Sequence, residues 1–137
     1  MTTSVYIDTS AFLAVLNADD AWHQRAAQLW FFLLDTGAKL FTNSLVLVET
    51  HALIQNRLGM DAVRTFTKNV LPVVKVQWMD EPLYQQSLTV LLSANRKNLS
   101  LVDCASFVTM SDLNLKKVFT FDAHFSEQGF EVLDIFN

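Results

Sequence analysis

The sequence predicts an α/β fold in which helices cover both faces of a mainly parallel sheet. Short β-type runs alternate along the chain with longer segments whose apolar residues recur at helical spacing, and this alternation is typical of such folds. The chain has 137 residues, of which 51% are apolar, so it is long enough for one domain with its own core. Glycine and proline are rare, and the ends of the segments are therefore indicated mainly by capping residues.

The first half of the chain begins with an apolar run that ends in Asp8, followed by Thr9 or Ser10 as the start of a helix. The predicted elements of this half are, in order, a strand over 4–8, a helix to 16, a helix over 21–34, a strand over 40–42, a helix over 44–59 and a helix over 61–69. Asp19 or Asp20 is expected to cap the second helix, and Ser44 the third.

The second half of the chain continues the alternation. Its predicted elements are a strand over 73–78, a helix over 81–94, a loop over 95–98, a helix that begins after Ser100, a strand over 118–121 and a last strand from Glu131 to Ile135. Asp80 is expected to cap the helix in which Glu81 and Pro82 form the first turn.

Four carboxylates stand in apolar surroundings: Asp8, Glu49, Asp103 and Asp122. Burying one uncompensated carboxylate costs several kcal/mol, and several together repel each other, so such a group requires protonation or a cation. Asp8 and Asp122 each follow a predicted strand, and sites in open parallel sheets form at the carboxyl ends of the strands. Glu49 and Asp103 lie near the starts of helices, from which they are able to reach the same crevice. The sequence is thus compatible with a convergent tetrad that binds a divalent ion.

Charge and composition exclude several other classes of protein. The net charge of −4 argues against a generally basic coat for nucleic acid, although bound divalent ions would attract phosphate locally. The single cysteine, Cys104, excludes an internal disulfide and a cysteine-rich zinc site. Because neither a signal sequence nor a membrane-spanning run is recognisable, we expect a cytoplasmic protein that does not enter a membrane.

Several motifs, taken in order, resemble those of PIN domains of the VapC-type toxin class. They are Tyr6-Ile7-Asp8-Thr9-Ser10, Glu49 within the segment 44–50, Leu99 to Phe107 around Asp103, and Thr120-Phe121-Asp122-Ala123-His124-Phe125 followed by Gly129-Phe130. The resemblance covers nearly the whole chain. It implies a single PIN-like nuclease domain over 1–137, built as a three-layer α/β/α sandwich around a mainly parallel sheet of four to five strands.

The resemblance also implies an activity and partners. Asp8, Glu49, Asp103 and Asp122 would be the catalytic acids that hold Mg²⁺ or Mn²⁺, with Thr9, Ser10 and Thr120 as supporting hydroxyls. The expected activity is that of a metal-dependent endoribonuclease, the toxin of a toxin–antitoxin pair, with RNA as substrate, a cognate antitoxin as partner and a homodimeric assembly. A metal-activated water would hydrolyse the phosphodiester and leave 5′-phosphate and 3′-hydroxyl ends.

Each of these residues also has a purely structural interpretation. Ser100 and Asp103 have the spacing of a capping box, whereas Asp8 and Asp122 also suit turns at strand ends. Glu49 is alternatively a buried acid paired with a distant base. Thr9 and Ser10 are common helix caps, and the metal route requires no histidine base, so His124 is expected to pack beside Phe125.

Other functions remain open at this point. A phosphoacceptor receiver domain also collects acids at strand ends, but it requires an acidic pair after the first strand and a lysine after a later one, and this chain has neither. A non-catalytic RNA-binding or interaction module on the PIN fold is a second alternative. A nuclease of RNA maturation without an antitoxin is a third.

Overall fold

The computed structural model describes residues 2–134, which form one parallel sheet in the order β3-β2-β1-β4-β5. The strands are β1 (Ser4–Ile7), β2 (Lys39–Asn43), β3 (Val74–Gln77), β4 (Lys117–Phe119) and β5 (Glu131–Val132). All four pairings between neighbouring strands are parallel. The expectation of a mainly parallel sheet of four to five strands is therefore confirmed.

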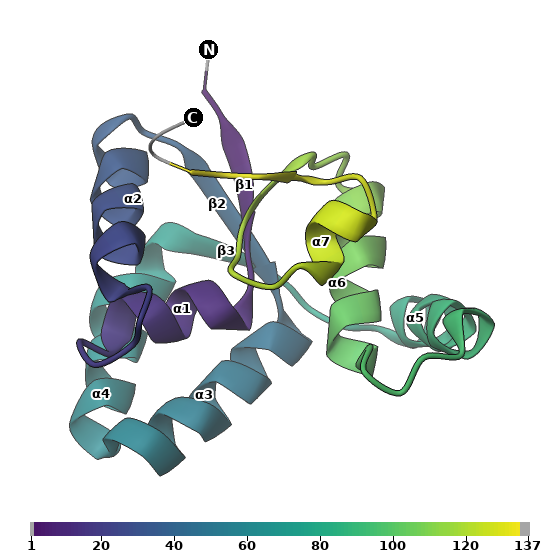
Figure 1. Ribbon diagram of the computed structural model, residues 1–137, viewed down its shortest axis with the longest axis horizontal. Coiled ribbons are helices and arrows are strands. Elements are labelled where there is room, and N and C mark those ends of the chain that lie inside the picture. The colour runs from purple at the N-terminus through teal and green to yellow at the C-terminus, as the bar shows by residue number, and fades with distance from the viewer. Residues whose placement is uncertain (1, 135–137) are drawn as a thin grey trace.

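The helices are distributed over both faces of this sheet. They are α1 (Thr9–Leu16), α2 (His23–Asp35), α3 (Ser44–Leu58), α4 (Met60–Thr65), α5 (Glu81–Ala94), α6 (Leu101–Asp112) and α7 (His124–Glu127). Helices α1, α2 and α4 lie on one side of the sheet, while α6 and α7 lie on the other with α5 packed outside α6 (Figure 1). This is the three-layer sandwich that the sequence predicts. None of the helices in residues 2–134 has the length and apolarity needed to cross a membrane.

The point at which the chain changes from adding strands on one side of the sheet to adding them on the other is β1. From β1 the chain adds β2 and β3 on one side, and β4 and β5 on the other. Crevices at such switch points, outside the carboxyl ends of the strands, are the usual ligand sites of open parallel sheets. Asp8 follows β1 at this point, and its backbone N–H donates to the Phe119 carbonyl at 3.1 Å. The ends of the two central strands, β1 and β4, are therefore held side by side.

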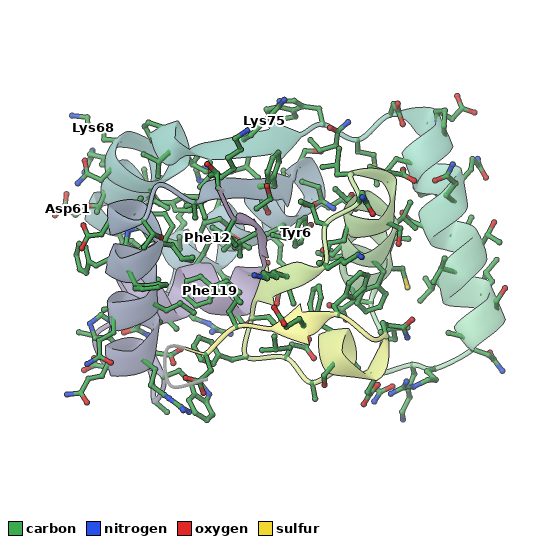
Figure 2. All side chains as sticks on the ribbon, turned by 90° about the horizontal axis from the view of Figure 1, so that it is seen from above. Tyr6, Phe12, Asp61, Lys68, Lys75 and Phe119 are labelled. Atoms are coloured by element: carbon green, nitrogen blue, oxygen red, sulfur yellow. The ribbon has the colours of Figure 1, made fainter. Side chains whose placement is uncertain are left out.

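Large apolar side chains fill the space between sheet and helices. Tyr6, Phe12 and Phe119 are essentially unexposed and lie in the interior, whereas Asp61 and Lys68 lie at the periphery (Figure 2). The Tyr6 hydroxyl donates to Ser106 Oγ at 2.8 Å, so this buried polar group is satisfied. Burial raises the pKa of the Tyr6 phenol, which stays protonated.

The observed boundaries differ from the predicted ones in several places. Helix α2 begins at His23 instead of 21, and α4 ends at Thr65, where a π-helical turn (Phe66–Val70) and a 3₁₀ turn (Leu71–Val73) replace the predicted continuation to 69. Helix α7 was not predicted, because its four residues are too few for a periodic pattern. The last strand ends at Val132, and Ile135, its predicted end, lies outside the described residues.

The prediction that Ser44 caps α3 is wrong. The Asn43 side chain accepts the Val46 N–H at 2.9 Å and donates to Thr109 Oγ1 at 3.2 Å, while Ser44 Oγ accepts the Met79 N–H at 2.8 Å. Asn43 thus ties the start of α3 to α6. Tertiary contacts, and not the local preference for serine, determine which side chain is the cap.

We expect Asn43→Ala to lower the free energy of unfolding by about 2 kcal/mol or more, because it removes a helix cap and leaves a buried hydroxyl short of a partner. Asp80 also caps a helix, accepting the Leu83 N–H at 2.9 Å, but it is exposed. The matched variant Asp80→Ala should therefore lower the free energy of unfolding by only about 1 kcal/mol. Urea unfolding of both variants measures the difference, and equal losses would contradict a tertiary role for Asn43.

Candidate active site

Asp8 lies at the centre of the crevice, directly after β1, and is only 4% exposed. Burial, with a smaller contribution from the charge of Asp103, raises its pKa from 3.8 to about 6. Hydrogen bonds from Thr120, from Ser10 and from the Thr9 backbone oppose this rise. An ionised carboxylate is therefore maintained here at neutral pH, but at a cost in free energy that a bound cation would offset.

Two hydroxyls hold the Asp8 carboxylate. Ser10 Oγ and Thr120 Oγ1 each donate to Asp8 Oδ2 at 3.0 Å. The same oxygens accept backbone N–H groups, Ser10 from Phe121 at 2.9 Å and Thr120 from Asp122 at 3.0 Å. These contacts connect the end of β1 to the segment that follows β4.

The expected alternative role of Thr9 and Ser10 as helix caps is not observed. Helix α1 begins at Thr9 without a side-chain cap, and backbone bonds to the Asp8 carbonyl form its first turn. Thr9 is buried and receives a weak hydrogen bond from Thr50 Oγ1 at 3.4 Å. This contact places the middle of α3 against the start of α1.

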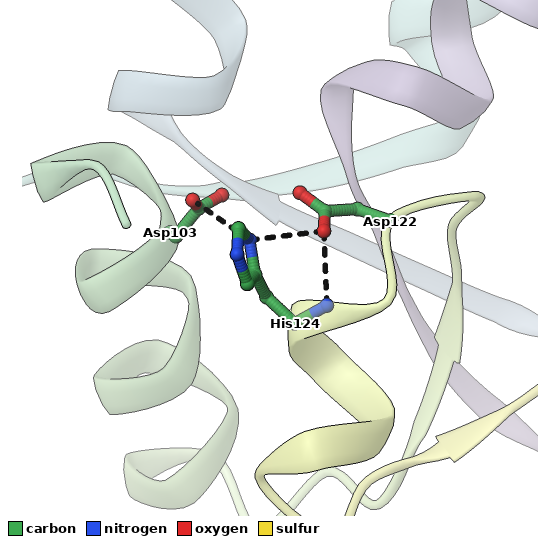
Figure 3. Close-up of side chains that lie close together, drawn as sticks. All are labelled: Asp103, Asp122 and His124. Atoms are coloured by element: carbon green, nitrogen blue, oxygen red, sulfur yellow. Dashed lines mark hydrogen bonds and ion pairs between the residues drawn. The ribbon is translucent and has the colours of Figure 1, made fainter. Parts of the chain in front are cut away.

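Asp103 and Asp122 converge on His124 from two different elements (Figure 3). His124 Nδ1 lies 3.0 Å from Asp122 Oδ1 and 3.5 Å from Asp103 Oδ2. Asp122 Oδ1 also accepts the His124 backbone N–H at 2.9 Å. Within residues 2–134, His124 Nδ1 is a buried nitrogen that no hydrogen bond satisfies, although two carboxylates are close to it.

The predicted capping box is confirmed at Asp103. Ser100 Oγ accepts the Asp103 N–H at 3.0 Å, and Asp103 Oδ2 accepts the Ser100 N–H at 3.1 Å. The structural interpretation and the proximity to the other acids therefore hold together. The cap fixes the rotamer of Asp103, whose side chain is only 14% exposed, in a position facing His124.

Glu49 lies further from this group. Donor atoms of Asp103, Asp122 and His124 lie within 4.8 Å of one another, and in the described part of the chain this set contains neither Glu49 nor Asp8. Asp8 is nevertheless close enough for the charge of Asp103 to affect its pKa. Glu49 is half-buried on α3, and its side chain makes no ion pair or hydrogen bond with residues 2–134. Pairing with a distant base, the structural alternative for Glu49, is thus not observed.

The donor set suits a divalent ion. Carboxylate oxygens are the preferred ligands of Mg²⁺ and Mn²⁺, and an imidazole nitrogen adds a donor that Mn²⁺ tolerates better than Mg²⁺. Negative charge gathered in a crevice with a buried, unsatisfied nitrogen is what a bound cation would compensate. The residues present therefore fit such an ion.

A family model of the PIN domain matches residues 5–131. The chain belongs to the PIN-domain family. The protein is 32% identical over 127 residues to the 23S rRNA-specific endonuclease VapC20 of Mycobacterium tuberculosis, with 92% of this chain and 95% of the relative covered. The resemblance to VapC-type PIN domains that the sequence predicts is thereby confirmed.

Solved structures agree with this assignment. The crystal structure of M. tuberculosis VapC20, a sarcin-ricin loop cleaving toxin, superposes with a TM-score of 0.84 at 30% identity and covers 95% of this chain and 98% of its own. FitAcB from Neisseria gonorrhoeae has a TM-score of 0.69 at 16% identity, over 95% and 96% of the two chains. VapBC2 from Rickettsia felis has a TM-score of 0.70 at 11% identity, and the match covers 96% of this chain and 98% of that chain. The last two similarities concern the fold alone.

Sequence reasoning missed His124 as a member of this PIN-domain site. We expected it to pack beside Phe125, but the imidazole turns toward Asp103 and Asp122. The spacing of Asp122 and His124 carried a usable signal, because an aspartate commonly accepts the backbone N–H two residues later. That turn brings the histidine ring back over the carboxylate.

The raised pKa of Asp8 predicts a pH-dependent stability in the absence of metal. Because the folded state holds this proton up to about pH 6 and the unfolded state releases it near 3.8, stability falls as the pH rises between these values. In chelator, the free energy of unfolding of the wild type relative to Asp8→Asn should drop by roughly 3 kcal/mol between about pH 4 and pH 7.

The matched control is Asp61→Asn, because the Asp61 side chain is fully exposed. Urea unfolding at several pH values measures both comparisons. A pH dependence that is the same in Asp8→Asn as in the wild type would contradict the assignment of the buried proton to Asp8.

Proposed function

We propose that this protein is a metal-dependent endoribonuclease that hydrolyses RNA phosphodiesters and leaves 5′-phosphate and 3′-hydroxyl ends. One observation carries the proposal. The carboxylates of Asp8, Asp103 and Asp122 gather at the switch point of a PIN-domain sheet, in a chain 32% identical to a named endonuclease. Acids collected in this way, around an unsatisfied nitrogen, suit the binding of a divalent ion in addition to their structural contacts.

We assign the metal to Asp103 and Asp122, with Asp8 as the third acid and Glu49, on α3, outside this set. When bound, Mg²⁺ or Mn²⁺ supplies Lewis acidity that lowers the pKa of water and balances the charge on the phosphate. The protein's own residues position this chemistry. Ser10 and Thr120 orient the Asp8 carboxylate, Thr9 packs the start of α1 against α3, and the His124 imidazole lies close to both Asp122 and Asp103.

The relative suggests a substrate to test first. M. tuberculosis VapC20 is specific for 23S rRNA and is described as cleaving the sarcin-ricin loop. We propose that the present protein also cuts an exposed loop of a structured RNA, since unpaired loops display the bases that proteins read most readily. We also propose a toxin role in the cytoplasm, with a cognate antitoxin as partner, because the same relative is described as a toxin.

We also propose that the protein forms a homodimer. Phe31 and Phe32 on the outer face of α2 are 62% and 51% exposed, and neighbouring exposed aromatics are typical of a contact surface. Two alternatives to the toxin role have distinct signatures. An interaction module would bind RNA without cutting it, and a maturation nuclease would cut RNA without an antitoxin-like reading frame upstream of its gene.

Cleavage of a mixed RNA pool tests the activity. We expect cutting in Mg²⁺ or Mn²⁺, none in chelator, and losses of more than roughly 100-fold in Asp8→Asn, Asp103→Asn and Asp122→Asn, since even the partners of metal ligands are worth 10–100-fold. Asp112→Asn is the matched control, because Asp112 is exposed at the opposite end of the helix that carries Asp103. Folded wild-type protein that leaves every RNA intact would overturn the nuclease assignment.

Calorimetric titration with Mn²⁺ distinguishes Glu49 from Asp103 and Asp122. Asp103→Asn and Asp122→Asn should weaken binding by roughly tenfold or more, because their carboxylates belong to the compact donor set. Glu49→Gln should weaken it less than about threefold, since Glu49 lies outside that set. A Glu49→Gln loss equal to that of Asp103→Asn would place Glu49 among the direct ligands.

A further inference from the structure

A cleft opens directly beside the acids. It has a volume of about 370 Å³ and lies between the start of α2, the segment after β4 and the end of β5. Thr120 and Asp122 belong to both the lining of this cleft and the acidic site, so the two are adjacent. Its volume is in the range of small-ligand sites. A molecule held at the acids would therefore extend into this space.

Two aromatic rings form a wall of the cleft. Trp22 and Phe121 are stacked with their planes 10° apart and their centres at 5.2 Å. The Arg25 guanidinium lies 5.9 Å from the centre of the Trp22 ring, and Trp22 remains 46% exposed. The helix predicted over 21–34 includes Trp22. Because the helix begins one residue later, at His23, the ring is instead at the open end of the helix.

The backbone segments that carry the two rings are restrained by hydrogen bonds. The backbone N–H of Trp22 donates to Asp20 Oδ1 at 2.8 Å, and the Trp22 carbonyl accepts the Ala26 N–H at 2.9 Å. The Phe121 N–H donates to Ser10 Oγ, which in turn donates to Asp8. The Ser10 hydroxyl thus contacts both the central carboxylate and the backbone of Phe121, one residue of the aromatic wall.

We propose that this cleft is a nucleobase subsite, which receives one unpaired base of the RNA whose scissile phosphate lies at the acids. The inference rests on the proposed nuclease function. Parallel stacking on aromatic side chains is the usual way in which proteins hold unpaired bases, and a guanidinium near the ring adds to it. Arg25 also pairs with Asp134 at 2.7 Å, so the wall presents donors and acceptors together. With Asp122 and Asp134 both lining the cleft, a base suits it better than a phosphate.

Single-turnover cleavage of a short RNA that the wild type cuts tests the subsite. A series of substrates carries one abasic nucleotide at each position next to the cut. At one of these positions, loss of the base should raise the RNA concentration for half-maximal rate by roughly tenfold for the wild type. Trp22→Ala should show that tenfold loss with intact RNA and no further loss with the abasic substrate. Trp22→Phe should lose less, because it keeps an aromatic face.

The control is Tyr84→Ala, which removes a 40% exposed aromatic from α5 on the opposite side of the sheet (Figure 1). It should cut intact RNA as the wild type does. Mn²⁺ affinity and the thermal midpoint should stay unchanged in Trp22→Phe, which keeps the test valid even when Trp22→Ala does not fold. If removal of the base raised the RNA concentration for half-maximal rate equally in the wild type and in both Trp22 variants, the subsite would be overturned and the nuclease would remain.

A fluorescence measurement separates failure of the subsite from failure of the nuclease. In Trp78→Phe protein, Trp22 is the exposed tryptophan, since Trp30 is 6% exposed. A short RNA should quench this emission, and the same RNA with the abasic position should not. Quenching without any cleavage would show that the cleft binds a base but would overturn the nuclease, whereas cleavage without quenching would overturn the subsite alone. Trp22 variants that lose only binding of an antitoxin would assign the cleft to a protein segment and overturn the proposal.

Discussion

The buried carboxylate of Asp8 is the constraint on which the site depends. A strand that ends in an acid at the centre of a sheet exposes that acid to a low dielectric, which raises its pKa to about 6. Two hydroxyls, from Ser10 and Thr120, keep the group in place by donating to the same oxygen. Because one hydroxyl comes from α1 and the other from the end of β4, stabilising Asp8 also fixes the edge of the sheet around it.

The other two acids of the crevice are held by local turns that serve the backbone at the same time. Asp103 completes the capping box of α6, and Asp122 accepts the N–H of His124 at the start of α7. A side chain restrained by its own backbone needs little further ordering when a ligand arrives. Capping and ligand binding are therefore compatible roles here, and the structural contacts explain why the carboxylates face the same imidazole.

The crevice and the neighbouring cleft divide recognition between charge and stacking. The protein carries a net charge of −4, so its overall charge does not attract a phosphate backbone. A cation held by the acids would supply that attraction at one point, and the stacked Trp22 and Phe121 would add an apolar contact at another. Recognition concentrated in two adjacent places favours a short, exposed loop of RNA over a long duplex.

The sequence by itself determined the fold class, the order of strands and helices, the Asp80 cap, the Ser100 capping box and the acids that follow β1 and β4. These features depend on residues at most a few positions apart, where periodicity and capping preferences are informative. The tertiary structure alone decided that Asn43 caps α3, that Ser10 serves Asp8 and not a helix end, and that Trp22 lines a cleft. Ser10 and Thr120 are 110 residues apart along the chain, and they meet only because β4 pairs with β1. No local pattern contains that pairing.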